Sequence, residues 1–316
     1  MILGDYSEDA PVMLKLYTAA TLKSDIVQVA HHGISDGNDT LNQTETEKLV
    51  QICTEEDPFD GEWHWKKGGM AYMIRTRGNR LVIIDGGRNV EDSRHLIAKA
   101  KELTGEEKPV VALWILPHPH VDHYNAILYL SRDEEMRNSL VIERFCFDLA
   151  ELGGNGVRLQ VLEIAENFKK GNTEILTPRT GNFWDIDGMT LKFFFTPADF
   201  DKLKDGNEYS LIFKVQGANK SVMFTGDAYP RTAARVALKF WDDLKSDICQ
   251  LAHHGLNGAD ASFYARVDAK TVLIPICKAG DREMNVPTAG ILPRFFAEKN
   301  ADLVIKAYEG DTELDL

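Results

Sequence analysis

The sequence predicts an α/β protein, because strand-like and helix-like patterns of apolar residues alternate along its 316 residues. Residues 110–116 are continuously apolar, which is typical of a buried strand. Residues 69–77 and 80–87 flank the turn dipeptide Gly78-Asn79 and are typical of a hairpin. Helices that cover a sheet are expected where apolar side chains recur at steps of three and four, at residues 90–103, 156–170 and 289–299.

The second half of the chain continues this alternation. Strands are expected at residues 189–196 and 221–225, and Pro230 stands at a favourable first position for the helix that follows. A further strand is expected at residues 247–251. The last two expected strands are residues 268–275 and 301–308, on either side of the final helix. Polar residues therefore follow several strand ends. Ligand-binding sites of α/β proteins commonly lie at the carboxyl ends of the strands.

A cluster of metal-ligand residue types follows the strand at 110–116. His118, His120, Asp122 and His123 occupy four of six consecutive positions, and three of the nine histidines of the chain lie there. Neutral imidazoles and a carboxylate suit zinc and similar first-row cations. A loop leaving a strand end can fold His118 and His120 onto one ion and Asp122 and His123 onto another. The spacing therefore predicts a two-metal site, for which hydrolysis is the natural chemistry.

Three further strand ends carry residues of the same kinds. Asp85 ends the hairpin, Asp227 follows the strand at 221–225 in a Gly-Asp pair, and His253-His254-Gly255 follows the strand at 247–251. The pattern His-x-His-x-Asp-His, together with these segments in this order, resembles the metallo-β-lactamase superfamily. The resemblance implies an α/β, metallo-β-lactamase-like four-layer αβ/βα sandwich, with two sheets inside, helices outside and the site at the strand ends.

The resemblance also implies the roles of these residues. Two divalent ions are expected, with zinc first and manganese or iron as alternatives. Asp227 would bridge the ions, and Asp85 would fix the tautomer of a ligand imidazole. Asp122 would also be catalytic, by positioning the ions, and His254 would contact the substrate or its leaving group. The implied ligands are His118, His120, Asp122, His123, Asp227 and His253.

One departure from the superfamily bears on the substrate. Its acyl hydrolases usually carry Thr-Pro-Gly-His after a central strand, whereas this chain has Thr196-Pro-Ala-Asp199, so that Asp199 or water would fill the position. Asn207, Ser210 and the His-His-Gly segment resemble instead the soluble domain of competence-type DNA-uptake proteins and the related phosphorylcholine esterases. A phosphoesterase or phosphodiesterase that uses a metal-bridging hydroxide is therefore expected. The alternatives are an acyl or lactone hydrolase of the same superfamily and a non-catalytic metal-binding protein.

The N-terminus contains a partial internal repeat. Residues 22–33 differ from residues 244–255 at only two of twelve positions, and Gly4-Asp5 matches Gly226-Asp227 at the same offset of 222 residues. Nothing before this copy supplies the first metal motif, so its His31 and His32 are expected to be relics. The sequence predicts an appendage at 1–57 and a catalytic domain at 58–316. The appendage is interpreted as a truncated tandem domain, a relic of duplication or a segment that docks on the catalytic domain.

The composition limits the partners. The formal net charge of −13 argues against broad nucleic-acid binding, which depends on basic surface. A small-molecule or phosphoester substrate is expected, and the oligomeric state is left open. No apolar run is long enough for a membrane span, and the start lacks a secretory signal pattern. The four cysteines lack paired spacing, which favours free thiols in a cytoplasmic protein.

Overall fold

The computed structural model describes residues 2–3, 28–29, 46–54, 68–148, 155–199, 206–283 and 291–316. The chain divides into two compact units, residues 1–41 and residues 42–316. In the first unit, β1 (Ile2–Leu3) pairs in parallel with β2 (Gln28–Val29), and Ile2 lies opposite Gln28. His31 and His32 lie outside the described residues.

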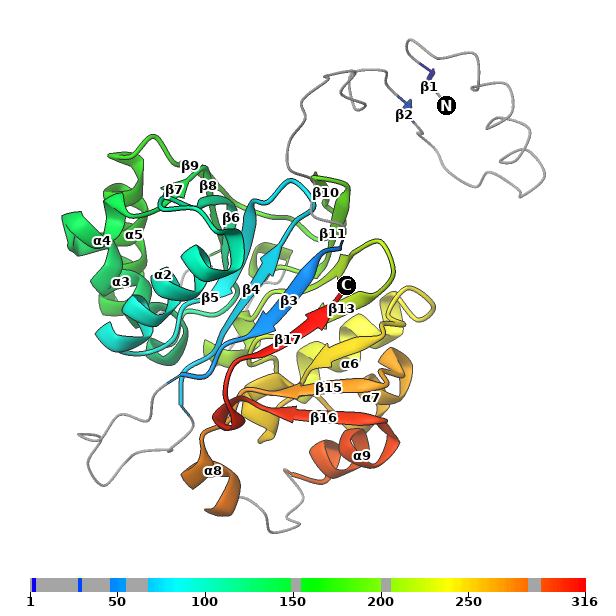
Figure 1. Ribbon diagram of the computed structural model, residues 1–316. Coiled ribbons are helices and arrows are strands. Elements are labelled where there is room, and N and C mark those ends of the chain that lie inside the picture. The colour runs from blue at the N-terminus through cyan, green and yellow to red at the C-terminus, as the bar shows by residue number, and fades with distance from the viewer. Residues whose placement is uncertain are drawn as a thin grey trace. The chain divides into compact units, whose positions relative to one another are not determined.

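Two β-sheets form the described part of the second unit (Figure 1). The eight-stranded sheet is antiparallel from β17 to β5 and parallel from β5 to β9. Its order is β17 (Thr312–Asp315), β3 (Lys48–Gln51), β4 (Ala71–Arg75), β5 (Leu81–Asp85), β6 (Val110–Leu116), β8 (Arg144–Phe147) and β9 (Glu174–Leu176), with β7 (Val141–Ile142) also paired to β6.

The seven-stranded sheet is antiparallel from β10 to β13 and parallel from β13 to β16. Its order is β10 (Phe183–Ile186), β11 (Met189–Phe195), β12 (Ile212–Gln216), β13 (Ser221–Phe224), β14 (Ile248–Gln250), β15 (Thr271–Ile274) and β16 (Leu303–Lys306). The parallel strands of both sheets are joined by helical crossovers, so each sheet has helices on its outer face.

Helices cover the outer faces of the two sheets (Figure 1). On the eight-stranded sheet these are α2 (Val90–Thr104), α3 (Val121–Arg132), α4 (Glu134–Asn138) and α5 (Asn155–Lys169). The other half contains α6 (Pro230–Lys239), α7 (Ala261–Val267), α8 (Lys278–Glu283) and α9 (Leu292–Asn300). Short 3-10 turns lie at η2 (Pro197–Asp199), η3 (Gly206–Tyr209), η4 (Ala252–Gly255) and η5 (Ala307–Glu309).

Three apolar cores separate the four layers. In β4, Met73 packs into the core between its sheet and the helices, whereas Tyr72 and Ile74 pack into the core between the sheets. This alternation follows from the pleat, which sends successive side chains to opposite faces. The third core lies between the seven-stranded sheet and helices such as α6 and α7. Because both faces of each sheet are buried, the central strands are continuously apolar. The predicted α/β four-layer sandwich is confirmed.

The boundary between the units differs from the expected one at residue 57. β3 lies between β17 and β4, and both Leu49 and Val50 are fully buried, one in the core between the sheets and the other under the helices. Residues 42–54 therefore belong with the second unit. The sequence pattern missed this because β3 has only four residues and is far from β17 along the chain.

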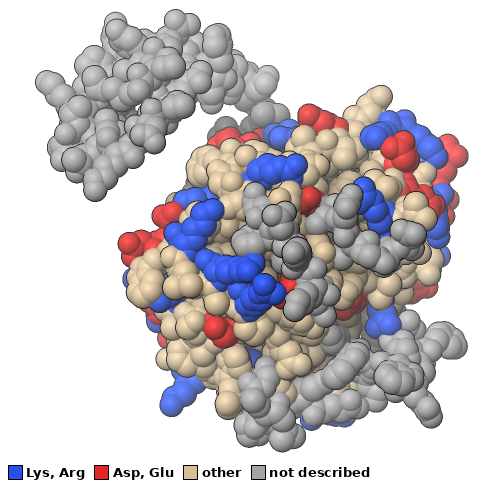
Figure 2. Space-filling model, turned by 180° about the vertical axis from the view of Figure 1, so that it is seen from behind, with Lys and Arg blue, Asp and Glu red and all other residues tan. Residues whose placement is uncertain are grey.

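One face of the second unit carries side chains of both charge signs (Figure 2). On the face shown in Figure 2, Lys and Arg side chains and Asp and Glu side chains are interspersed among other residues. The net charge of −13 is thus not gathered into an acidic covering on that face. Among the described helices, none has both the length and the apolar composition that crossing a membrane requires. All four cysteines are free thiols.

Candidate metal centre

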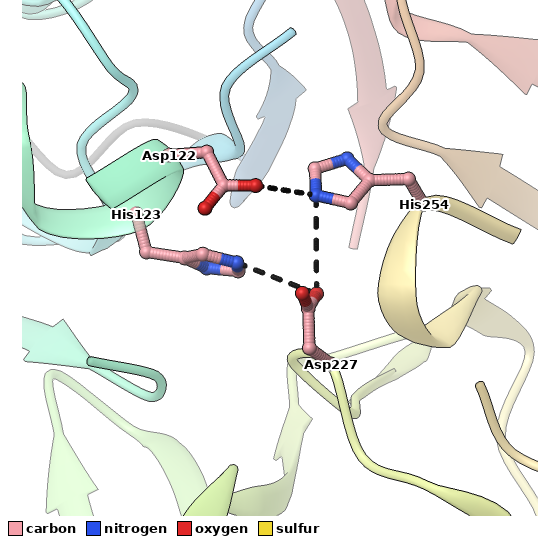
Figure 3. Close-up of side chains that lie close together, drawn as sticks. All are labelled: Asp122, His123, Asp227 and His254. Carbon is pink, nitrogen blue, oxygen red and sulfur yellow. Dashed lines mark hydrogen bonds and ion pairs between the residues drawn. The ribbon is translucent and has the colours of Figure 1, made fainter. Parts of the chain in front are cut away.

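The candidate site forms where strands of both sheets end. The loop after β6 and the first turn of α3 bring His118, His120, Asp122 and His123 from the eight-stranded sheet. From the other sheet, Asp227 follows β13, and the η4 turn after β14 carries the two neighbouring histidines. Figure 3 shows that the side chains of Asp122, His123, Asp227 and His254 point toward one another.

Asp227 stands at the centre of this arrangement. Its Oδ1 lies 3.3 Å from Nε2 of His123 and 3.9 Å from Nε2 of His254. Its Oδ2 lies 4.0 Å from Nε2 of His118 and 3.8 Å from Nε2 of His253. The carboxylate is buried, and each of its oxygens faces a different pair of imidazoles. This geometry is suited to a carboxylate that bridges two cations.

The possible donors fall into two groups that share Asp227. Asp122, His123, His254 and Asp227 offer atoms within 4.8 Å of one another and are called here the four-donor group. His118, His120 and Asp227 do the same and are called the three-donor group. Donors bound to one zinc ion at about 2.0–2.2 Å lie roughly 3–4 Å apart, so both groups are compact enough to hold an ion.

Several buried atoms of the site lack the partners that buried polar atoms need. Nε2 of His118 is buried and has no hydrogen-bond partner among the described residues, and the buried Nε2 of His123 and Oδ1 of Asp227 face each other as an ion pair at 3.3 Å without good hydrogen-bond geometry. Each such atom costs about 1–3 kcal/mol when it is left unsatisfied. These three atoms come from two segments, the connection from β6 into α3 and the loop after β13, and face the same space. Divalent ions bound there would satisfy them, so the residues fit the expected metals.

In three of the candidate imidazoles, the ring nitrogen that points away from the site has a partner behind it. Nδ1 of His123 lies 2.8 Å from Oδ1 of Asp85, and Nδ1 of His118 lies 3.0 Å from Oγ of Ser210. Nδ1 of His254 donates to the carbonyl oxygen of Pro275. A carbonyl can only accept, so His254 carries its proton on Nδ1 and turns the lone pair of Nε2 toward the site.

Burial and nearby charge set the protonation of the site. Burial lowers the pKa of His118 well below its usual value, which keeps this imidazole neutral and able to bind a cation. For His123 burial also acts to lower the pKa, but the negative charges of Asp85 and Asp227 raise it well above the usual value. Burial raises the pKa of Asp85 itself to about 6. A proton on His123 thus offsets the negative charge of Asp85 and Asp227, which a bound cation would otherwise offset.

The His-His-Gly turn has an unusual backbone. His253, His254 and Gly255 have φ values of 52°, 58° and 74°, all in the left-handed region. This conformation costs roughly 1–2 kcal/mol for each residue other than glycine, so the fold maintains it against its intrinsic cost. The turn directs two successive imidazoles toward Asp227, instead of sending them to opposite sides as a strand would.

The structure places His254, the expected substrate contact, among the candidate donors, whereas His253, the expected ligand, lies in neither donor group. His254 is fully buried and belongs to the four-donor group, and its Nε2 lies 3.1 Å from Oδ2 of Asp122. His253 belongs to neither group, and its ring lies edge-on to Tyr229 with centroids 5.6 Å apart. The sequence-based assignment gave the metal to His253 and the substrate to His254. It could not fix this order, because the left-handed turn decides which imidazole enters the site.

The remaining predicted residue and two unpredicted ones complete the site. Asp199 ends η2, and its side chain, which was expected to be a possible ligand, lies outside the described part. Ser210 was part of a noted motif, but its contact with His118 was not expected. A Cβ added to Gly206 would lie 2.3 Å from Nε2 of His120, so this glycine permits a close approach. No sequence signal indicated that contact, which joins distant segments.

Comparisons with known proteins support the fold. No protein-family model and no curated protein matches the sequence. The solved structure of the metallo-beta-lactamase fold protein YhfI from Bacillus subtilis is similar, with a TM-score of 0.52 and 13% identity over 85% of this chain and 100% of that chain. Zn(2+)-bound PqqB from Methylobacterium extorquens is similar with a TM-score of 0.50 and 11% identity, over 85% and 100% of the two chains. With the two-sheet architecture, these similarities show that the chain has the metallo-β-lactamase fold.

Proposed function

We propose that this chain is a metal-dependent hydrolase of phosphoesters. The observation that supports the proposal best is the position of Asp227, whose two oxygens face separate groups of buried imidazoles. Two divalent ions held there would lower the pKa of a water molecule and offset negative charge that develops on a substrate. His118 and His120 would hold one ion, Asp122, His123 and His254 the other, and Asp227 would contact both.

The surrounding residues would keep this arrangement fixed. Asp85, Ser210 and the carbonyl of Pro275 orient three imidazoles through their Nδ1 atoms. The burial of these contacts lowers the local dielectric constant and strengthens them. His253 retains 11% exposure of its side chain and lies beside Tyr229, so it is the histidine of the turn that can contact a substrate. Preorganised groups of this kind stabilise charge without rearranging during the reaction.

One observation supports phosphoesters over acyl substrates. The three-donor group has only His118 and His120 besides the shared Asp227, and no described residue adds a third histidine. A position remains for an anionic substrate oxygen, and a phosphoester offers several such oxygens.

We propose zinc as the metal, since the similar protein PqqB has bound Zn(2+) and imidazole donors suit it. Manganese and iron remain alternatives for an oxygen-rich site.

The test is a substrate screen of the full-length, metal-loaded protein. Aryl phosphomonoesters and phosphodiesters are expected to be cleaved, and Asp227→Asn is expected to lower turnover at least about a hundredfold. Asp302→Asn, which changes an exposed carboxylate, is the matched control and is expected to retain full activity. Lactone or thioester cleavage without phosphoester cleavage would contradict the proposed phosphoester substrates and favour an acyl or lactone hydrolase. Full metal content without any turnover would contradict the proposed enzyme and favour a non-catalytic metal-binding protein.

A further inference from the structure

The turn that carries His254 is supported from two sides. Nδ1 of His254 donates to the carbonyl oxygen of Pro275, which directly follows β15. On the other side, a Cβ added to Gly255 would lie 3.0 Å from Cδ of Arg294, so the aliphatic stem of this arginine packs against the glycine. Both His254 and Gly255 have a left-handed backbone, with φ values of 58° and 74°. Because this conformation is not intrinsically favoured at a histidine, the neighbours of the turn must maintain it.

Arg294 is a buried cation on α9. Its side chain is only 2% exposed. It pairs through Nη2 with Asp281 on α8, and through Nε with Glu298 on its own helix at 2.8 Å. Removing such a pair from water is costly, and an apolar side chain of similar length would also fill the space beside Gly255. What the ion pair adds is a fixed geometry, because it ties α9 to α8.

Asp281 connects Arg294 back to Pro275. The backbone N–H of Asp281 donates to the carbonyl oxygen of Cys277 at 3.0 Å, and Cys277 is two residues after Pro275. A path of contacts therefore runs from His254 through Pro275 and α8 to the carboxylate of Asp281. Arg294 closes this path, because it pairs with Asp281 and packs against the glycine that follows His254.

The carboxylate of Asp281 is itself anchored. Its Oδ2 accepts hydrogen bonds from Nζ of Lys306 and from the hydroxyl group of Tyr308, each at 2.9 Å. Burial acts to raise the pKa of Asp281, but the hydrogen bonds from Arg294, Lys306 and Tyr308 hold it below its usual value. The carboxylate is therefore charged at neutral pH and joins α8 to α9 and to β16.

We propose that Arg294 is a positioning residue for the metal centre and that it acts through His254. Its ion pair with Asp281 fixes both supports of the turn, which then direct Nε2 of His254 toward the other members of the four-donor group (Figure 3). A residue that contacts neither an ion nor the substrate thereby sets the metal affinity. The role of Arg294 rests on metal binding by the four-donor group, which is part of the proposed function.

A double-mutant cycle of Zn²⁺ affinity in the full-length protein tests this role. Arg294→Met keeps an unbranched stem and removes the guanidinium. It is expected to lower the affinity for Zn²⁺ at least about tenfold, as measured by competition with a chromogenic chelator. In the His254→Ala background, the same substitution should change the affinity less than about twofold, because the residue through which Arg294 acts is gone. An equal loss in both backgrounds would overturn the proposal and make Arg294 a general support of the fold.

Two further variants separate positioning from general stability. Asp281→Asn keeps the size of the side chain and removes its charge, so it should reproduce the loss and its dependence on His254 even if Arg294→Met does not fold. Asp187→Asn is the matched control, because it also removes a carboxylate that accepts hydrogen bonds from an arginine, Arg80, but at the β10–β11 turn. Its affinity for Zn²⁺ should stay unchanged. Unchanged affinity in Asp281→Asn, or an equal loss in Asp187→Asn, would contradict the positioning role.

Hydrogen exchange of the metal-free protein tests the turn without any ion. The backbone N–H of His253 donates to the carbonyl oxygen of Gly226 at 3.1 Å, and that of Leu256 donates to His253 at 2.9 Å. Arg294→Met is expected to speed the exchange of these two amides at least about tenfold, while the amides of β6 keep their protection. Unaltered exchange in the turn, or the same acceleration in β6, would speak against a local role of Arg294.

These measurements use Zn²⁺ alone or no ligand, so they can be read apart from the proposed function. A non-additive cycle in a protein that cleaves no phosphoester would contradict the function and support the role of Arg294. An additive cycle in an active phosphoesterase would do the opposite.

Discussion

Ser210 connects two ligand-bearing loops through a single hydroxyl group. Its Oγ accepts the backbone N–H of Asp227 at 2.9 Å and lies 3.0 Å from Nδ1 of His118. The residue is fully buried, so neither contact competes with water. One small side chain thereby orients donors that precede α3 and follow β13, which are far apart in the sequence.

Replacing this hydroxyl is expected to weaken metal binding more than folding. Ser210→Ala leaves the imidazole of His118 without its outer partner, and loss of such a partner typically lowers metal affinity about 10- to 100-fold. Competition of the protein with a chromogenic chelator measures the change. Ser262→Ala, at an exposed position on α7, is the control. Unchanged affinity in Ser210→Ala would show that the backbone alone orients His118.

The close approach of Gly206 to His120 gives a second prediction at this scale. In Gly206→Ala, the new methyl group would fall 2.3 Å from Nε2 of His120, so the ring or the η3 turn must move. We expect the three-donor group to lose its ion while the four-donor group keeps its own, as measured by elemental analysis after dialysis. Gly171→Ala is the matched control, because its nearest neighbour would be at an ordinary 3.4 Å. Two retained ions in Gly206→Ala would contradict the expectation.

The sequence indicated which side chains would converge, but not which of the two histidines in the η4 turn would face Asp122. His118, His120, Asp122 and His123 could be identified because their spacing within one loop is local information. The exchange between His253 and His254 depends on φ values near 50–60°, which residue identity alone does not determine. Contacts such as that between Gly206 and His120 join segments about ninety residues apart, and one sequence gives no signal for them.

At the scale of elements, two hairpins clamp the sheets together away from the metal residues. Asp187 lies at the turn between β10 and β11. Its carboxylate accepts hydrogen bonds from Oγ1 of Thr76 and from Nε and Nη2 of Arg80, both in the β4–β5 hairpin. A Cβ on Gly78 would lie 2.6 Å from this carboxylate, so the glycine leaves room for it. The contact ties an end of one sheet to an end of the other.

This clamp predicts a pH-dependent stability. Burial acts to raise the pKa of Asp187, but hydrogen bonds from Arg80 and Thr76 hold it below its usual value. Its stabilisation is therefore complete above the unfolded pKa of about 3.9 and is lost as the pH falls through the lower, folded pKa. Asp187→Asn is expected to lower the free energy of unfolding by about 1–3 kcal/mol at pH 7.

Urea denaturation of the metal-free protein at pH 7 and near pH 3 measures this effect. The difference between Asp187→Asn and the unaltered protein should shrink at the lower pH. Asp185→Asn is the control, because Asp185 lies in the same hairpin and its Oδ1 accepts from the backbone N–H of Gly188. A difference that stays constant with pH would show that the carboxylate charge does not supply the stabilisation.

Elements with long apolar patterns were predictable, and the edge strands were not. β6 is buried on both faces, and β11 ends in the buried run Phe193-Phe194-Phe195, so their composition identified them. β17 is largely polar and partly exposed at the sheet edge, and it gave no pattern to read. β3 could be placed only through its pairing with β4 and with β17, and the pairing with β17 links residues more than two hundred positions apart.

At the scale of the whole molecule, the pairing of β3 decides where the chain can be shortened. A variant that starts at Asn42 keeps both sheets and all the candidate ligands. A variant that starts at Phe59 loses β3 and exposes the edges of β4 and β17. We expect the first to fold and to bind metal like the full chain, and the second to unfold or aggregate.

Thermal unfolding and elemental analysis compare these variants. The full-length double variant His31→Ala, His32→Ala is the control for the N-terminal histidines and is expected to bind the same number of ions. Loss of metal or activity in this folded double variant would make the N-terminal segment part of a site. Normal folding of the variant that starts at Phe59 would show that β3 is dispensable.

The register of the first unit supports our interpretation that it copies part of the second. Ile2 lies opposite Gln28, and adding the offset of 222 residues gives Phe224 opposite Gln250. That pair continues the observed register of β13 and β14, in which Val222 faces Ile248 and Met223 faces Cys249. The sequence predicted the duplicated strand–helix–strand unit from identity, and the matching register is an independent argument for it.

The origin of the donors in two sheets has a mechanical consequence. Asp122 and His123 follow β6 of one sheet, whereas Asp227 and His254 follow β13 and β14 of the other. An ion in the four-donor group would act as a cross-link between the two halves of the sandwich and oppose their sliding apart. At a free concentration of 100 times the dissociation constant, it should add about 2.7 kcal/mol to the free energy of unfolding. Urea denaturation at increasing Zn²⁺ should follow this dependence, and the loss of metal would release the halves to move against each other.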